Sequence, residues 1–301
     1  MISPNRIFPL PFIFRGKRLF SVPLRLAVHE PPLHDVVSVE AGEQPALPIP
    51  AGADGLLQRY VADPGWRTHT VRDDRIAYVL LRDVWHYLVW PGYERFLEGR
   101  YSAKTRESFV REEARFVAEF GSDGRLDLRS YRSPAEIAEF LGHVEAVRVL
   151  GGISGCTLPD GNLGESAAGG DVNGFVLFAG SAPVAYVCLQ ADGQTLQYVC
   201  AGERDDFRSW SAGAILHLQA FQRIFADPRF RYVDFRPGES EVKRQFANGA
   251  LRSATVLNLR LTLRNRLLMA VYGLLMRGSA AGGATGSSVP DEIRAQLAGL
   301  G

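Results

Sequence analysis

The order of apolar and polar residues in the first part of the chain predicts short β-strands. Prolines punctuate the β-type runs at residues 7–14, 18–28 and 35–39, and nine of the seventeen prolines fall within the first fifty residues. A further β-type run covers residues 66–81. Proline has no amide hydrogen to donate to a neighbouring strand. We therefore expect these strands at the edge of a sheet or in a small sheet.

Two helices are predicted in the middle of the chain. From Ser102 to residue 120, phenylalanine and valine recur at helical spacing, and Gly121 ends the pattern. This helix is expected to connect two halves of the chain. The next helix begins at Ser133-Pro134-Ala135-Glu136. Serine caps the free amides, proline suits the first helical position, and glutamate three residues after the serine completes a capping box.

The second half reads as a mixed α+β fold. After a glycine- and alanine-rich loop, three strands are separated by turns short enough for antiparallel hairpins. A helix, a strand, a short helix and a last strand follow, which predicts a sheet made of a meander and one crossover. The segments are a loop at 158–173, strands at 174–179, 184–190 and 195–201, a helix at 211–225, a strand at 231–235, a helix at 240–246 and a strand at 253–263.

An apolar run at 267–276 follows, and it is too short to span a bilayer. We expect this run to cover the sheet of the second domain. The alternative is peripheral contact with a membrane surface, such as the inner membrane. After it, the composition predicts a flexible linker at 279–288 and a short helix at 291–300.

Composition limits the classes of function. The 301 residues carry 34 basic and 33 acidic side chains, and this balance disfavours a DNA-binding protein. Three cysteines are too few for a disulfide framework or a structural zinc site. Prolines interrupt the start of the chain, where a signal peptide would need an apolar helix. We therefore expect a cytoplasmic protein without a metal ion.

The first candidate site is a polar loop at 202–208 followed by Ser211-Ala212-Gly213 at a helix start. Free amides at the start of a helix attract anions, and small residues allow a ligand to approach closely. This pattern predicts a binding site for a phosphate-bearing donor. The alternative is that Ser211 only caps the helix.

A second candidate site follows the strand at 231–235. Asp234 is expected at the carboxyl end of a central strand, where ligand clefts open in α/β sheets. Gly238 permits a sharp turn, and Lys243, one of only three lysines, lies about one helical turn after Glu239. The alternative assigns Asp234 to capping the strand end and Lys243 to an ion pair with Glu239.

Other reactive residue types have structural interpretations. We expect His217 as a half-buried histidine with satisfied hydrogen bonds, and His86 as part of an aromatic cluster. Cys188 and Cys200 fall within predicted strands and are expected to be inert. Cys156 lies in a loop without an activating neighbour in the sequence.

The segment from Asp234 to Phe246, with the pattern D-F-x-x-G-x-x-x-x-K-x-x-F, resembles a signature of bacterial GNAT-fold acyltransferases. The family concerned is the FemAB-related acetyltransferases of the cellulose-biosynthesis (CelD-like) type. Lys104-Thr105-Arg106 is similar to that family's linker-helix motif, and Ser211-Ala212-Gly213 is similar to its S-P-G helix start. The resemblance covers most of the chain and is strongest from about residue 93 to residue 263.

The resemblance implies an α+β fold of two tandem GNAT-like (acyl-CoA N-acyltransferase) halves with mixed central sheets, the first half abbreviated. It divides the chain into three parts. An abbreviated domain at 1–125 ends in the linker helix at 102–120. The acyltransferase domain follows at 126–265, and a tail of apolar helix, linker and short helix covers 266–301.

The resemblance also implies a V-shaped gap between the strands at 195–201 and 231–235, where a thioester donor enters. The segment at 208–213 departs from the usual R/Q-x-x-G-x-G/A phosphate pattern, because Ser211 replaces the first glycine. Val242 stands where the family commonly has a tyrosine, so a tyrosine general acid is not expected there. The implied donor-binding residues are Tyr198, Val199, Cys200, Arg208, Ser211, Ala212 and Gly213.

In the implied reaction, an amine or hydroxyl attacks the acyl carbon directly. We expect Asp234 or Glu239 to act as the base and Lys243 to orient the acceptor. The expected donor is acyl-CoA or an acylated acyl carrier protein, and the acceptor is a glycan, lipid or peptide intermediate. Two alternatives stay open: a FemX-like ligase that uses aminoacyl-tRNA, and a non-catalytic scaffold of an exopolysaccharide system.

Overall fold

The structure is a computed structural model, and its contacts divide the chain into two compact units. Unit 1 comprises Met1–Trp85 with Leu251–Gly301, and unit 2 comprises His86–Ala250. The boundaries predicted after residues 125 and 265 differ from these limits and stay predictions of domain organisation. The structure describes residues 2–14, 17–38, 47–66, 69–72, 74–150, 167–280 and 293.

Four expectations from the sequence lie wholly or partly outside these residues. They are Cys156, most of the loop at 158–173, the linker from residue 281 onward, and all but Ile293 of the helix at 291–300.

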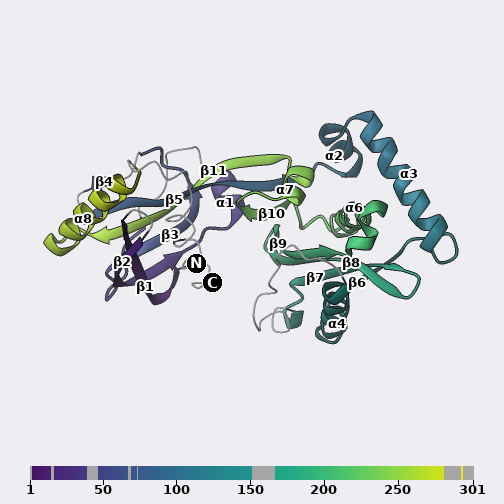
Figure 1. Cartoon of the computed structure of the whole chain (residues 1–301), viewed down its shortest axis with the longest axis horizontal. Helices are drawn as coiled ribbons and strands as arrows, with labels where there is room; N and C mark the ends of the chain where they lie inside the picture. The colour runs from purple at the N-terminus through teal and green to yellow at the C-terminus, as the bar shows by residue number, and fades with distance from the viewer. Residues whose placement is uncertain are drawn as a thin grey trace. The chain divides into compact units, whose positions relative to one another are not determined.

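Unit 1 is built on a mixed sheet (Figure 1). Its first two strands pair antiparallel and place Pro9 opposite Pro23. The first of them is the terminal strand of the sheet, as the prolines predict. In order across the sheet the strands are β1 (Ile2–Phe14), β2 (Lys17–His29), β3 (Gly55–Ala62), β11 (Gly249–Arg260) and β5 (Arg75–Val89), with β4 (His69–Arg72) paired to β5.

Two expectations about unit 1 are wrong. The run at 35–39 is not a strand, because residues Leu33–Ser38 form helix α1 and bury Leu33 and Val36, which are three positions apart. Helix α8 (Leu263–Ala280) does not cover the sheet of unit 2. It packs in unit 1, where Tyr272 contacts the rings of Phe12 and Tyr78. No helix in the described part of the chain has both the length and the apolar character needed to cross a membrane.

Unit 2 contains the predicted meander and crossover. Strands β7, β8 and β9 pair antiparallel in chain order, and β10 returns parallel to β9 through helix α6 (Ala212–Ile224). The sequence pattern missed β6, which pairs with β7. The strands in spatial order are β10 (Tyr232–Pro237), β9 (Thr195–Glu203), β8 (Ala182–Asp192), β7 (Val172–Ala179) and β6 (Asp127–Tyr131).

Both predicted helices of the middle region form, with the caps that the sequence indicates. Ser102 Oγ accepts the Thr105 amide at the start of α3 (Ala103–Phe120). At α4 (Pro134–Leu150), Glu136 Oε2 accepts the Ser133 amide at 2.8 Å, and Ser133 Oγ accepts the Glu136 amide at 3.4 Å. The amide hydrogen bonds hold the pKa of Glu136 below its usual value. The capping box is confirmed.

Alternate residues of the strands pack on opposite faces of the unit 2 sheet. Phe175 and Leu177 pack with the residues of α6, whereas Val176 and Phe178 pack with those of α4. Figure 1 shows the two helices on opposite sides of the strands. Helix α2 (Tyr93–Arg100) and helix α3 add aromatic residues to the α6 side. The site described below lies on this side of β9 and at the end of β10.

Candidate active site at the ends of β9 and β10

The parallel ladder between β9 and β10 is short. It joins Thr195–Gln197 to Tyr232–Asp234, while β9 continues to Glu203. Directly after this ladder, β9 carries a β-bulge: Tyr198 pairs with Leu189 and Cys200 pairs with Cys188, so that Val199 is the extra residue. Bulges bend a strand and redirect its side chains, and they are frequent beside active sites. The ladder therefore ends at the point where the sequence predicts that the two strands part.

Tyr198 points from the bulge toward α6 and meets His217. The Tyr198 hydroxyl lies 2.8 Å from His217 Nε2, and His217 Nδ1 lies 2.6 Å from the Gly213 carbonyl oxygen. The rings of Tyr198 and His217 stack with their centroids 5.8 Å apart. The ring of Phe246 also stacks on that of His217, with a centroid distance of 4.9 Å. A histidine four positions after Gly213 in a helix can reach that carbonyl, which is the one sequence signal for this contact.

The hydrogen bonds determine the tautomer of His217. Burial lowers the pKa of His217 to about 4, so the imidazole is neutral at pH 7. A carbonyl oxygen only accepts hydrogen bonds, so Nδ1 carries the proton. Nε2 is then an acceptor, and the Tyr198 hydroxyl donates to it. His217 is satisfied, as predicted, but it is fully buried instead of half-buried.

The start of α6 holds a carboxylate of the chain itself. Glu203 Oε2 accepts the amide of Gly213 at 2.7 Å. A Cβ atom at Gly213 would lie 2.6 Å from the same oxygen, so a side chain at this position would displace the carboxylate from its present place. Arg208 forms an ion pair with Asp205 at 2.9 Å and approaches Glu203 at 3.8 Å. Two of the predicted phosphate-binding groups, Gly213 and Arg208, therefore lie beside acidic side chains.

Ser211, at the same helix start, has a φ of 55° and makes no side-chain cap hydrogen bond. Its side chain does not serve as the cap that the alternative interpretation expected. Ala212, the first residue of α6, is fully buried. Sequence reasoning missed Glu203, because ten residues separate it from Gly213 and no local pattern connects the two.

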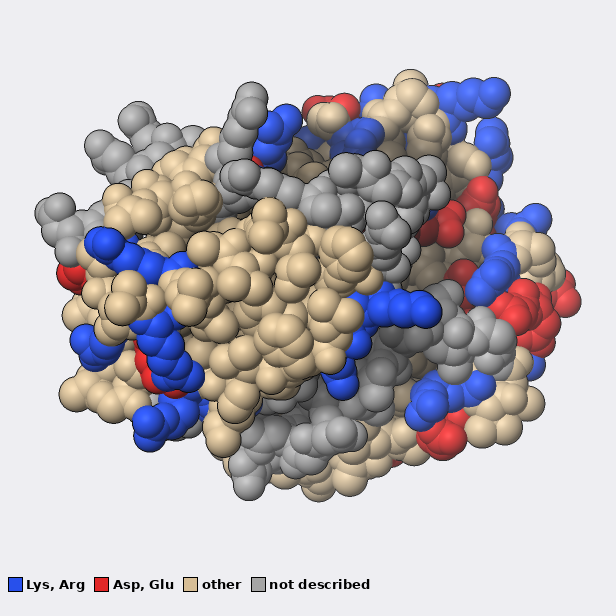
Figure 2. Space-filling model, turned by 60° about the vertical axis from the view of Figure 1, so that its left-hand side comes forward, with Lys and Arg blue, Asp and Glu red and all other residues tan. Residues whose placement is uncertain are grey.

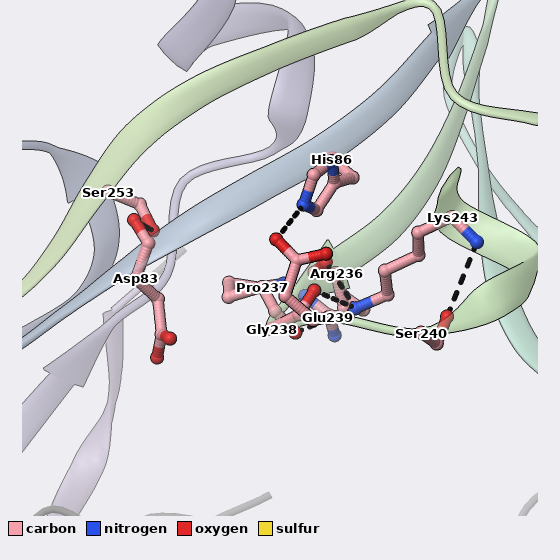
Figure 3. Close-up of polar contacts among 9 residues, drawn as sticks. All are labelled: Asp83, His86, Arg236, Pro237, Gly238, Glu239, Ser240, Lys243 and Ser253. Atoms are coloured by element: carbon pink, nitrogen blue, oxygen red, sulfur yellow. Dashed lines mark hydrogen bonds and ion pairs between the residues drawn. The ribbon is translucent and has the colours of Figure 1, made fainter. Parts of the chain in front are cut away.

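The turn between β10 and α7 (Glu241–Phe246) is held by three residues of the D-F-x-x-G-x-x-x-x-K pattern, of which Figure 3 shows Gly238 and Lys243. Asp234 is buried, and its Oδ1 accepts the amide of Arg236 at 2.7 Å. Arg236 and Gly238 both have positive φ, 64° and 91°, a region that glycine adopts without strain. The ammonium of Lys243 donates to the carbonyl oxygens of residues 236, 237 and 238 at 2.8, 2.8 and 2.9 Å.

These contacts give the signature a structural meaning. Asp234 accepts the Arg236 amide where the β9–β10 ladder ends, Gly238 allows the turn, and Lys243 compensates the three carbonyl dipoles that the turn directs toward it. Asp234 lies inside β10, three residues before its end, and not at the strand end where the sequence placed it. The ammonium of Lys243 makes these backbone hydrogen bonds, and its charge also contributes to lowering the pKa of Glu239, after the larger effect of His86.

Glu239 is presented by this turn and meets His86. Its Oε1 lies 2.9 Å from His86 Nε2, near the end of β5 (Figure 3). The Glu239 side chain is 57% exposed, whereas that of Asp234 is 3% exposed. The hydrogen bond from His86 holds the pKa of Glu239 below its usual value, so the carboxylate is ionised at neutral pH. The sequence predicted only aromatic neighbours for His86 and did not indicate its contact with Glu239.

Within the described residues, no group of three or more histidine, cysteine, aspartate or glutamate side chains is arranged to hold a metal ion. Cys188 and Cys200 are buried in the core between the sheet and α4.

Comparison with known proteins assigns a class to this region. Residues 103–244 match the family described as acetyltransferase (GNAT) domain. The fold class predicted from the sequence, an α+β chain of GNAT-like fold with mixed sheets, is confirmed. A GNAT-type domain indicates a transferase. A search of curated proteins found no match to the sequence.

Several solved structures are similar to the chain at low sequence identity. FemX is 9% identical, with 89% of this chain and 91% of FemX covered and a TM-score of 0.49. The C-terminal domain of a putative lysylphosphatidylglycerol synthetase from Agrobacterium fabrum is 9% identical, with coverages of 75% and 73% and a TM-score of 0.44. A tandem GNAT protein from the clavulanic acid biosynthesis pathway is 10% identical, with coverages of 68% and 64% and a TM-score of 0.32.

Proposed function

We propose that unit 2 transfers an acyl group from a thioester donor to an amine or hydroxyl acceptor. The observation that carries this proposal is the place where the β9–β10 ladder ends, with the bulge of β9 and the Tyr198–His217 pair directly after it. The donor's arm follows β9 at this point, beside Tyr198, Val199 and Cys200. The match of residues 103–244 to an acetyltransferase domain supports the same reaction class.

The proposed reaction is a direct displacement. The acceptor's nitrogen or oxygen forms a bond to the acyl carbon, the carbon–sulfur bond breaks, and the thiolate leaves with the electron pair. The acceptor loses one proton and the thiolate gains one, so one base and one acid are required. The backbone amides of the bulge polarise the thioester carbonyl as its oxygen becomes negative.

Glu239 is the proposed base. It is ionised at neutral pH, solvent-accessible and held by His86 at 2.9 Å. Asp234 was the other candidate for this role, but its buried carboxylate already accepts the amide of Arg236. We therefore propose Asp234 and Lys243 as positioning residues that shape the turn presenting Glu239. Orientation of the acceptor by Lys243 stays a prediction of the sequence.

Tyr198 is the proposed acid. Its hydroxyl lies at the bulge, and its proton is directed to Nε2 of a neutral histidine. When a thiolate forms beside Tyr198, the hydroxyl can turn to it and donate. His217 is the residue that fixes the ring of Tyr198. This assignment supplies an acid from β9 in a chain that has Val242 at the position of the expected tyrosine.

A second candidate function is aminoacyl transfer from tRNA. One observation favours it: the Gly213 amide, at the predicted phosphate site, is bonded to the carboxylate of Glu203. A second anion at this helix start would meet that negative charge. A donor whose phosphates lie elsewhere avoids the conflict, whereas coenzyme A requires Glu203 to move. A non-catalytic scaffold in a cytoplasmic exopolysaccharide system is the remaining alternative.

The donor can be identified by thermal unfolding with four ligands: coenzyme A, a long-chain acyl-CoA, an acylated acyl carrier protein and aminoacyl-tRNA. A ligand at about one hundred times its dissociation constant stabilises the folded state by about 2.7 kcal/mol. A shift with one ligand, and loss of its acyl group in mass spectra when amine acceptors are added, supports the proposal. No shift with any of the four favours the scaffold.

A further inference from the structure

Helix α8 in unit 1 has apolar residues on two faces. Its inner face packs in the core of unit 1 through Met269 and Tyr272. Three leucines at spacings of four and seven lie on its other face, and they are 85%, 66% and 71% exposed. They are Leu263, Leu267 and Leu274. Isolated exposed leucines are ordinary, but a row along one helix face indicates a surface that contacts something apolar.

The hairpin of β1 and β2 lies beside this helix. Phe12 of β1 contacts Tyr272 of α8 edge to face at 5.4 Å, and Phe20 of β2 stacks on Phe12 at 4.6 Å. Phe20 is 48% exposed and its neighbour Leu19 is 54% exposed. The hairpin therefore adds apolar side chains to the same region of unit 1 as α8. We call the exposed residues of α8 and of the β2 start the basic apolar surface.

The charge of these two elements has a single sign. Residues 263–280 contain three arginines and no acidic residue, and residues 1–29 contain five basic residues and no acidic one. Lys17, Arg18 and Arg266 are exposed. Arg264 is 65% exposed and approaches Asp54 at 3.8 Å. Figure 2 turns this part of the molecule forward and shows a broad area without charged residues, flanked by lysine and arginine and with few acidic side chains.

We propose that the basic apolar surface binds the headgroup region of an anionic phospholipid bilayer. Leucine and phenylalanine side chains enter the boundary between headgroups and acyl chains, while lysine and arginine bind the anionic headgroups. The surface lies on the bilayer and does not cross it. The inference stands apart from the acyl-transfer proposal, because it rests on unit 1 alone.

Two other occupants fit the same surface less well. A second copy of the chain would bring two surfaces of the same positive sign together, which opposes association. An RNA would use the cations but not the row of leucines, because bases stack on aromatic rings or guanidinium groups and not on aliphatic chains. Anionic lipid satisfies both the charge and the apolar character.

The test is flotation of the full chain with vesicles of phosphatidylcholine alone and with vesicles that also contain phosphatidylglycerol. We expect binding to the anionic vesicles and little to the neutral ones, with binding reduced by salt. The double substitution Leu267→Gln/Leu274→Gln should weaken binding by about tenfold or more. Glutamine is a good helix former, so α8 is retained. Lys17→Gln/Arg266→Gln should weaken binding by about fivefold per charge.

The matched control is Val110→Gln, because Val110 is 70% exposed on α3 of unit 2. Its binding should equal that of the unchanged chain, and all variants should share one melting temperature within about 2 °C. The proposal is overturned by equal binding to both kinds of vesicle, by no binding to either, or by full binding of the leucine variant. It is also overturned if the chain binds no vesicles and the leucine substitutions instead abolish a dimer of the chain. The same holds if they abolish binding of tRNA.

Discussion

The hydroxyl of Tyr198 donates a hydrogen bond of 2.8 Å to Nε2 of His217, whose other nitrogen donates to the Gly213 carbonyl. This relationship links the bulge of β9 to the first turn of α6. It depends on a neutral imidazole, because a protonated His217 would have no acceptor for the tyrosine. The position of the Tyr198 hydroxyl at the bulge therefore depends on the protonation state of the buried imidazole of His217.

His217 should make stability depend on pH in the acidic range. Its pKa is about 4 in the folded protein and about 6.5 in an unfolded chain. The unfolded state therefore binds a proton that the folded state does not, and stability present above pH 6.5 is lost as the pH falls toward 4. The loss reaches about 3 kcal/mol. Denaturant unfolding at a series of pH values measures it.

The variant His217→Gln is the control for this prediction. Glutamine can donate and accept hydrogen bonds but does not titrate. All other carboxylates and histidines remain, so the difference between the two pH profiles isolates His217. The two profiles should converge at acidic pH. Parallel profiles would contradict the assignment of a neutral, buried His217.

Lys243→Met should destabilise unit 2. Methionine keeps much of the aliphatic chain but leaves three carbonyl oxygens without the ammonium that they share. Hydrogen bonds to a charged group contribute more than neutral ones, and we expect a loss of about 2 kcal/mol or more in the free energy of unfolding. Lys104→Met, at the exposed start of α3, is the matched control and should change stability by less than about 0.5 kcal/mol. Equal effects would exclude the turn-stabilising role.

A pair of substitutions separates the two candidate bases. Glu239→Gln removes the accessible carboxylate and should lower turnover by about a hundredfold or more. Asp234→Asn keeps the oxygen that accepts the Arg236 amide and should retain the fold and most of the turnover. The release of free thiol from the donor that stabilises the chain measures both. If the two effects are reversed, Asp234 is the base and the role proposed for Glu239 is wrong.

Local patterns in the sequence predicted the elements that depend on local physics. The caps at Ser102 and Ser133, the meander and the crossover all appear where the periodicity and the turns place them. The strand expected at 35–39 is wrong because a run of five residues has too little periodicity to distinguish a strand from a helix. The prediction that α8 covers the sheet of unit 2 is wrong because an apolar run does not specify which sheet it packs against.

Only the part of the candidate site formed by residues close together in the sequence could be predicted. The pattern from Asp234 to Lys243 is one turn, and its residues were found together. The partners that complete the site come from distant segments. His86 reaches Glu239 across 153 positions, and Tyr198 reaches His217 from a neighbouring strand. Such contacts depend on how strands are ordered in the sheet, which no local pattern encodes.

Glu203→Gln should raise the affinity of the chain for coenzyme A. In the structure the carboxylate of Glu203 holds the Gly213 amide and places a negative charge at the start of α6. Glutamine keeps an oxygen for that amide but removes the charge, so a phosphate can approach the helix start without repulsion. We expect affinity to rise by about threefold to tenfold in titration calorimetry.

The matched control is Asp205→Asn, which removes a charge from the same loop, where Asp205 pairs with Arg208. This change leaves the bond between Glu203 and Gly213 in place and should raise the affinity less. An equal gain in both variants would assign the effect to the net charge of the loop. A gain confined to Glu203→Gln would identify this one carboxylate as the group that opposes phosphate-bearing donors. It would also explain why a chain with a GNAT-type domain carries an acidic side chain where its donor's phosphates are expected.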